Sequence, residues 1–147
     1  MEAAMSTERN EALVRRYFSE CVSGVTGPDR DGALSLVDEL MSDDFVMAYS
    51  YETPGEAGLG RERHKEFLLG HAEAFPEDHW TVEALVADEA MVACEWRFRG
   101  RHAESGNQID VLAADFFSVR DGRLTELRRF MDFADFRAQL KGRSSRR

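Results

Sequence analysis

One segment of the chain, ADFFSVRDGRLTELRRF at residues 114–130, places charged groups where apolar core residues are expected. Asp115 is flanked on both sides by apolar residues, and Arg128 and Arg129 follow on the stretch that should pair with it. A carboxylate buried alone is costly, so we expect it to form an ion pair with an arginine. That pair is either a structural contact between strands or a polar spot on the wall of an apolar ligand pocket.

The turn between the two strands decides which arginine faces the carboxylate. A two-residue turn at Asp121 and Gly122 would put Arg128 opposite Asp115, whereas a three-residue turn with Gly122 left-handed would put Arg129 on its face, diagonally displaced. Of these two registers, we prefer the second. We therefore expect Asp115 and Arg129 to point into a cavity and to touch directly or through a water. Asp115 would then orient Arg129 toward a substrate carbonyl or carboxylate.

Aromatic residues on two earlier strands are the second group of candidates. If the turn after Ala87 spans three residues, one face of this hairpin is entirely apolar. That face carries Trp80, Val82, Ala84 and Val86 on one strand and Val92, Cys94, Trp96 and Phe98 on the other. Trp80, Trp96 and Phe98 should therefore line the interior, where they either fill a core or form the walls of a ligand cavity.

The elements that must position these residues follow a simple order along the chain. Apolar residues at helical spacing predict three helices, and the period then changes to that of strands. The predicted helices span residues 7–24, 31–41 and 61–75, and Ser6 or Thr7 caps the first of them. The predicted strands span residues 43–49, 79–87, 91–102, 108–120 and 123–133. A last helical turn begins at Asp132 or Asp135. Helices followed by an antiparallel meander predict an α+β fold in which curved strands and helices enclose a cavity. One domain, residues 6–140, is expected between flexible termini at 1–5 and 141–147.

The stretch RGRHAESGN, residues 99–107, joins two of the long strands. It contains Gly100, Gly106 and several charges but no large apolar residue, which predicts a mobile loop. It is either an ordinary hairpin tip or a lip over the cavity mouth, with His102 as a contact for the ligand.

The strand face opposite Asp115 is also apolar. Leu112, Ala114 and Phe116 alternate with the carboxylate, so they should point away from the cavity beside charged Glu95 and Arg97. An apolar stripe with a polar rim predicts a homodimer packed through the outer face of the sheet.

Composition limits the classes of function. The 147-residue chain carries a net charge of -9, which argues against a nucleic-acid partner. No apolar run approaches the ~18 residues of a membrane span, and the N-terminus lacks a secretory pattern, so a cytoplasmic protein is expected. Cys21 and Cys94 have no paired or metal-binding spacing, and His64 and His71 lack a third ligand nearby, so neither a metal nor another cofactor is expected.

Three segments resemble a SnoaL-like polyketide cyclase: GRERHKEF, DHWTVEALVADEAMVACEWRFRGRH and DVLAADFFSVRDGRLTELRRFMDF. That family belongs to the nuclear transport factor 2-like superfamily, together with ketosteroid isomerase and limonene-epoxide hydrolase. The resemblance covers residues 10–140 and implies a cone-shaped α+β barrel. In such a fold, N-terminal helices pack on a strongly curved antiparallel sheet that encloses a deep cavity.

The resemblance to ketosteroid isomerase gives three positions a role. Tyr17 falls where that enzyme has the tyrosine of its oxyanion hole, and Asp115 falls where it has the protonated aspartic acid. Tyr49 stands at the position of the general-base aspartate, a role that a tyrosine does not easily take near neutral pH.

The cyclases and the epoxide hydrolase differ from this chain at their acid–base positions. The aldol cyclases have a histidine where Asp115 stands, and their catalytic aspartate, like that of the epoxide hydrolase, aligns with Arg129. That position faces the cavity in the relatives, which is why the bulged register was preferred. Further pocket residues of the epoxide hydrolase align with Met47, Tyr49, Trp96 and Phe98. The chain thus keeps the fold but replaces the recognised catalytic sets.

These observations favour a cofactor-independent cyclase that holds a flexible polyketide-type chain in an apolar cavity for ring closure. The predicted catalytic residues are Asp115, Arg129, Tyr17 and Tyr49, and the predicted substrate-binding residues are Met47, Trp80, Trp96, Phe98, His102 and Phe117. Two alternatives remain open. One is an isomerase, dehydratase or epoxide hydrolase, with Asp115 as the acid or base of the proton-transfer enzymes. The other is a domain that binds small molecules or assembles without catalysis.

Overall fold

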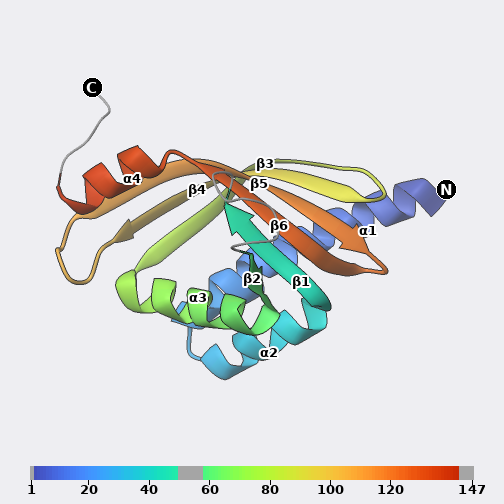
Figure 1. The fold of residues 1–147 in the computed structure, drawn as a ribbon, viewed down its shortest axis with the longest axis horizontal. Helices are drawn as coiled ribbons and strands as arrows, with labels where there is room; N and C mark the ends of the chain where they lie inside the picture. Colours follow the sequence, from blue (N-terminus) through green and yellow to red (C-terminus); the bar gives the residue numbers. More distant parts are fainter. Residues whose placement is uncertain (1, 50–57, 143–147) are drawn as a thin grey trace.

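The computed structural model describes residues 2–49 and 58–142, which fold in the predicted order of helices followed by a sheet (Figure 1). The first half contains α1 (Glu2–Arg16), the π-helix η1 (Tyr17–Val22), the 3₁₀ turn η2 (Gly24–Thr26), α2 (Arg30–Leu40), β1 (Met41–Tyr49), β2 (Leu59–Gly60) and α3 (Arg61–Ala74). The second half contains β3 (Asp78–Ala87), β4 (Met91–Arg101), β5 (Gln108–Arg120), β6 (Arg123–Met131) and α4 (Phe133–Leu140). Part of the predicted flexible N-terminus is helical, and residues 1 and 143–147 lie outside the described part.

The sheet has six strands in the order β2-β1-β6-β5-β4-β3. The four strands from β3 to β6 form the predicted antiparallel meander. Strand β1 pairs with β6 in parallel, so the sheet as a whole is mixed. The sheet is curved and open, and α2 and α3 lie along one side of it while α4 lies at one end (Figure 1). Among the described helices, none is long and apolar enough to cross a bilayer.

The first helix extends further toward the N-terminus than its predicted cap allowed. It begins at Glu2, upstream of Ser6 and Thr7, and beyond Arg16 it continues as a π-helix. The wider turn of this π-helix buries Tyr17, Phe18, Cys21 and Val22 together against the sheet. Two of the later helices have aspartate caps: Asp29 accepts a hydrogen bond from the Gly32 N–H at the start of α2, and Asp132 accepts one from the Asp135 N–H at the start of α4.

The hairpin of β3 and β4 confirms the inward position of the three aromatic residues but not the whole predicted face. Trp80 pairs with Phe98 and Val82 with Trp96, as expected. A bulge at Glu83 then shifts the register, so that Leu85 and not Ala84 pairs with Cys94. As a result Val86 is turned outward and is 68% exposed.

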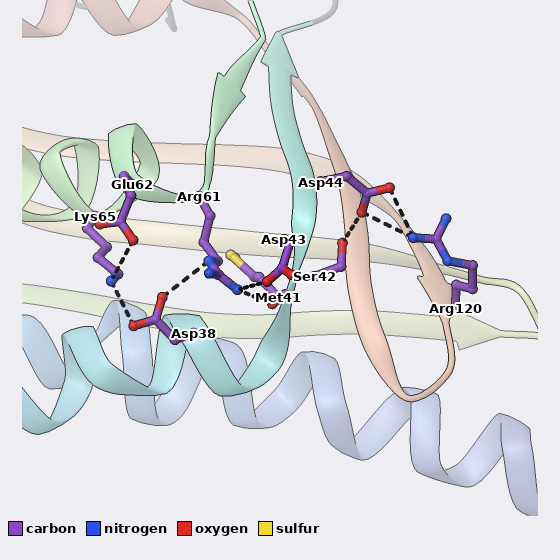
Figure 2. Close-up of polar contacts among 9 residues, drawn as sticks. All are labelled: Asp38, Met41, Ser42, Asp43, Asp44, Arg61, Glu62, Lys65 and Arg120. Carbon is purple, nitrogen blue, oxygen red and sulfur yellow. Dashed lines mark hydrogen bonds and ion pairs between the residues drawn. The ribbon is translucent and has the colours of Figure 1, made fainter.

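A network of ion pairs fixes the start of α3 to the elements beside it (Figure 2). The Arg61 guanidinium lies 3.2 Å from the Asp38 carboxylate of α2 and 2.9 Å from the Asp43 carboxylate of β1. Lys65, one turn further along α3, lies 2.8 Å from Asp38. Each exposed pair contributes little by itself, but a shared network holds α3 in one position over the sheet. Helix α3 is thereby placed as one wall of the site described next.

Candidate active site

The predicted ion pair exists and is deeply buried. The Arg129 Nε–H donates to Oδ1 of Asp115 and an Nη2–H donates to Oδ2, both at 2.9 Å. Asp115 is 0% exposed and Arg129 is 4% exposed. Because both carboxylate oxygens accept hydrogen bonds from one guanidinium group, the pair has the bidentate geometry that gives an arginine a defined orientation.

The register that makes this pair differs from the one predicted. The turn has two residues, Asp121 and Gly122, with φ of 51° and 75°, so the predicted three-residue turn is wrong. A bulge at Thr125 supplies the missing shift in register, since it adds one residue to β6. Arg129 therefore lies directly opposite Asp115 and is not diagonally displaced.

The buried guanidinium remains charged and keeps hydrogen-bonding capacity. Burial alone would lower the pKa of Arg129, but the Asp115 carboxylate raises it above its ordinary value. The guanidinium carbon also lies 4.7 Å from the centre of the Trp96 ring, a cation–π contact. Two of the five guanidinium N–H groups bind Asp115, and among the described residues none accepts a bond from the other three.

The curved sheet, α3 and α4 enclose a cavity of about 480 Å³ next to this pair. Its lining is aromatic and aliphatic apart from His71 and two arginines. The lining residues are Tyr49, Phe67, Gly70, His71, Trp80, Trp96, Phe98, Val111, Arg129, Met131, Phe133, Phe136 and Arg137. Five of the residues predicted for the site therefore come together here: Tyr49, Trp80, Trp96, Phe98 and Arg129.

Three of the residues predicted to contact substrate lie elsewhere in this structure. Met47 and Phe117 are buried in the core and do not belong to the cavity lining. His102 lies in the hairpin after β4, where its Nδ1 is 2.8 Å from the Ser105 hydroxyl and its ring packs against Phe75. The β4 strand continues to Arg101, so the connecting segment is shorter than predicted. Its mobility and its role as a lip remain predictions.

Tyr17 lies beneath the cavity and not in its lining. Its hydroxyl is 2.8 Å from Nε2 of His64, and both side chains are fully buried. Burial raises the pKa of Tyr17 above its ordinary value, so the hydroxyl keeps its proton. Tyr17 borders, together with Arg129, a small void between this buried pair and the main cavity.

Sequence reasoning missed the walls that α3 and α4 contribute. Gly70 and His71 come from α3, and Phe133, Phe136 and Arg137 come from α4. His71 had been examined only as a metal ligand because of its spacing from His64. In the described part of the chain, no three His, Cys, Asp or Glu side chains gather as they would around a metal ion. The sequence already placed His71 on the same helical face as Phe67, but nothing in the sequence showed that this face borders a cavity.

The fold agrees with comparisons to known proteins. The SnoaL-like domain matches residues 12–127, and the chain belongs to this family. A protein assigned as a SnoaL-like polyketide cyclase from Jannaschia sp. CCS1 has a TM-score of 0.76 at 22% identity, with 90% of this chain and 92% of that chain covered. Among curated protein sequences, none matches the chain.

Two further structures share the fold but carry other names. An LEH-like epoxide hydrolase from M. tuberculosis has a TM-score of 0.67 at 21% identity, covering 92% of each chain. A phenazine biosynthesis-related protein from Pseudomonas aeruginosa has a TM-score of 0.73 at 18% identity, covering 99% of this chain and 93% of that one. The same fold thus occurs in proteins named as a cyclase and as a hydrolase, and identities this low establish only the fold.

Proposed function

We propose that the protein is a cofactor-independent cyclase of a polyketide-type intermediate. The observation that supports this most is the cavity itself: about 480 Å³, walled by aromatic rings, with Arg129 at one point of its surface. Asp115, which was expected to point into the cavity, does not line it and holds Arg129 from behind. Small-molecule sites typically combine such an apolar enclosure with a few placed polar groups. The names of the structural relatives suggest the substrate class.

The cavity suits ring closure because that reaction is largely a problem of shape. A flexible chain must bring its two reacting ends together, and holding them in place can remove roughly 7–11 kcal/mol of barrier in favourable cases. Arg129 supplies what such a closure needs in addition, since its remaining N–H groups can stabilise negative charge on a carbonyl oxygen. Asp115 does not need to react in this scheme, because its role is to fix the orientation of Arg129.

The test is incubation of the protein with linear polyketides of graded length, followed by mass spectrometry and NMR of the products. A cyclase should convert at least one chain to a ring product faster than the buffer does. A protein that only binds would leave every linear polyketide unconverted, and that result would support the assembly or binding alternative. Ring formation that continues unchanged with heat-denatured protein would contradict the proposal.

Gly70 allows the cavity to be closed without disturbing the fold. A Cβ added at Gly70 would meet no atom within 4 Å, and the residue lines the cavity from α3. We expect Gly70→Phe to fill the cavity and to weaken ligand binding by about tenfold or more, equivalent to at least ~1.4 kcal/mol. Binding can be followed with the bicyclic aryl ketone α-tetralone, because both tryptophans of the chain line the cavity and report on it.

Gly70→Ala is the matched control for the same position. It should bind α-tetralone as the unaltered protein does and should be more stable by about 1 kcal/mol, since alanine is the better helix former. Equal quenching of tryptophan fluorescence in the phenylalanine and alanine variants would show that ligands bind outside this cavity.

We also propose that the protein forms a homodimer through the outer face of the sheet. Leu112, Phe116 and Phe130 are 38%, 41% and 39% exposed there, and the Phe116 and Phe130 rings contact each other at 5.5 Å. Light scattering should give twice the chain mass of 16.7 kDa. Phe116→Glu should give the monomer mass, whereas Ser35→Glu, at an exposed site on α2 away from this face, should not. A monomeric unaltered protein at micromolar concentration would refute the dimer.

A further inference from the structure

A second pair of polar side chains, His71 and Asp78, lies at the cavity wall and is separate from the Asp115–Arg129 pair. His71 of α3 lines the cavity, and its side chain is 18% exposed. Its Nε2 atom is buried without a hydrogen-bond partner and lies 3.9 Å from Oδ2 of Asp78. A buried ring nitrogen left without a partner costs roughly 1–3 kcal/mol, so its position beside a carboxylate needs an explanation.

Asp78 is held in place from two sides. Its Oδ2 accepts a hydrogen bond from the Trp80 indole N–H at 3.0 Å. Its Oδ1 lies 3.3 Å from the Thr26 hydroxyl, whose one proton also has the Ser23 carbonyl as an acceptor at 2.9 Å. The side chain is only 3% exposed, and burial raises the pKa of Asp78. The carboxylate is therefore a fixed acceptor that needs only a short movement of His71 to form a hydrogen bond with it.

The surroundings keep His71 in its neutral form. Its ring packs against Phe75 of α3, Trp80 of β3 and Phe98 of β4. The charged groups around it are Asp78 and, in the cavity lining, Arg129 and Arg137. Burial, and then the positive charge of Arg129, lowers the pKa of His71 to about 4. At any pH well above that value the imidazole is unprotonated and available as a base, and a hydrogen bond to the Asp78 carboxylate makes it a stronger one.

We propose that His71 is the proton-accepting residue of this cavity, that Asp78 positions it, and that the ligand is a carbonyl compound with a C–H group next to its carbonyl. Nε2–H of His71 donates to Asp78, which leaves Nδ1 as the base, and the carbonyl oxygen binds the free N–H groups of Arg129. The distance of 3.9 Å between His71 and Asp78 shortens when the ligand binds, as catalytic hydrogen bonds often do. The inference rests on the proposed function, because it places the ligand in the same cavity.

The proton transfer is balanced without any further reactant. The ligand C–H proton moves to His71, its electron pair becomes the carbon–carbon double bond of an enolate, and the carbonyl π pair moves to the oxygen beside Arg129. The imidazolium so formed is stabilised by Asp78. The enolate carbonyl then re-forms as its carbon attacks a second carbonyl carbon of the same ligand, which closes a ring. The π pair of that second carbonyl moves to its oxygen, and this oxygen takes the proton from His71.

The experiment follows exchange of the protons next to the carbonyl of α-tetralone in D₂O by NMR. The unaltered protein should accelerate this exchange, and His71→Gln should reduce the acceleration by about 100-fold or more, as expected for loss of a general base. His71→Phe, which keeps the ring packing, should show the same loss if the glutamine variant folds poorly. His79→Gln, an exposed histidine on β3, should behave as the unaltered protein does.

The outcomes separate the inference from the proposed function. Exchange that survives in both His71 variants, or α-tetralone that binds without any exchange, overturns the role of His71 and leaves the cavity as a ligand site. Tryptophan fluorescence that does not respond to α-tetralone contradicts both proposals.

The positioning role of Asp78 has its own measurement. In Asp78→Asn the pH profile of exchange should move to lower pH, because the histidine loses the negative charge that stabilises its protonated form. A merely structural Asp78 would lower the rate without moving the profile, and that result would overturn the positioning role.

Discussion

Replacing Arg129 with methionine is expected to lower the free energy of unfolding by about 3–5 kcal/mol, since it leaves a buried carboxylate without its partner. Asp115 is 0% exposed and receives two hydrogen bonds from Arg129, and the substitution removes both of these bonds. Urea denaturation followed by circular dichroism measures the loss. The same variant should abolish any activity that depends on a carbonyl bound at Arg129.

Two further variants make this result specific. Arg128→Met alters the neighbouring, exposed arginine on the other face of β6 and should cost less than about 1 kcal/mol. The double variant Asp115→Leu/Arg129→Met removes both charges and should recover most of the stability, because apolar pairs often replace buried ion pairs without loss. If Arg129→Met unfolds at the urea concentration of the unaltered protein, the pair is not what holds these strands together.

The Asp115–Arg129 pair could be predicted because a buried carboxylate limits the possible partners to a few residues. The pair was predicted correctly, but the turn that was chosen to explain it was wrong. Asp121 and Gly122 are a strong two-residue turn pattern, but that turn alone would have selected Arg128. The bulge at Thr125 restores Arg129, and threonine is so common in strands that nothing in the sequence marks the extra residue.

The position of β1 and the bulge at Glu83 were unpredictable for a related reason. Alternating apolar residues define which face of a strand is buried, but they do not say which strand lies beside it or where the register slips. The parallel pairing of β1 with β6 joins segments that are distant in sequence. The hairpin prediction held only as far as the bulge, which is why Trp80 was placed correctly and Val86 was not.

The cavity wall from α3 and α4 was missed because an inward helical residue looks the same in the sequence whether it meets core or cavity. His71 and Asp78 illustrate the limit. They are close in sequence, but a helix ends and a strand begins between them. Only the structure shows that this reversal brings the ring within 3.9 Å of the carboxylate.

The second large effect that we expect is a loss of stability in mild acid, caused by histidines that are buried without charge. Burial, and then the Arg129 charge, lowers the pKa of His64 to about 3, and the same causes lower that of His71 to about 4. An unfolded histidine has a pKa near ~6.5. Between these values the unfolded chain binds protons that the folded protein does not bind.

The sign of the effect follows from this difference in bound protons. The stabilising contribution is fully present above pH ~6.5, and it is lost as the pH falls toward the folded-state values. For each histidine the free energy of unfolding should fall by up to ~1.4 kcal/mol per pH unit below pH ~6.5. Over the window from pH ~6.5 to 5, the two histidines together should cost roughly 3–4 kcal/mol.

The slope of stability against pH is the quantity to measure, because the substitutions also change stability at neutral pH. The slope is proportional to the number of protons taken up on unfolding. His64→Gln, which keeps a polar group for Tyr17, should lower that number by about one, and His71→Phe should lower it by about one more. His79→Gln, at an exposed position, should leave the slope unchanged. NMR titration should find the His64 ring uncharged down to pH ~5, since its protonated form would leave a charge among apolar residues. A His64 signal that titrates near pH ~6.5 in the folded protein would mean that the ring is accessible to water and would remove the basis for the predicted acid sensitivity.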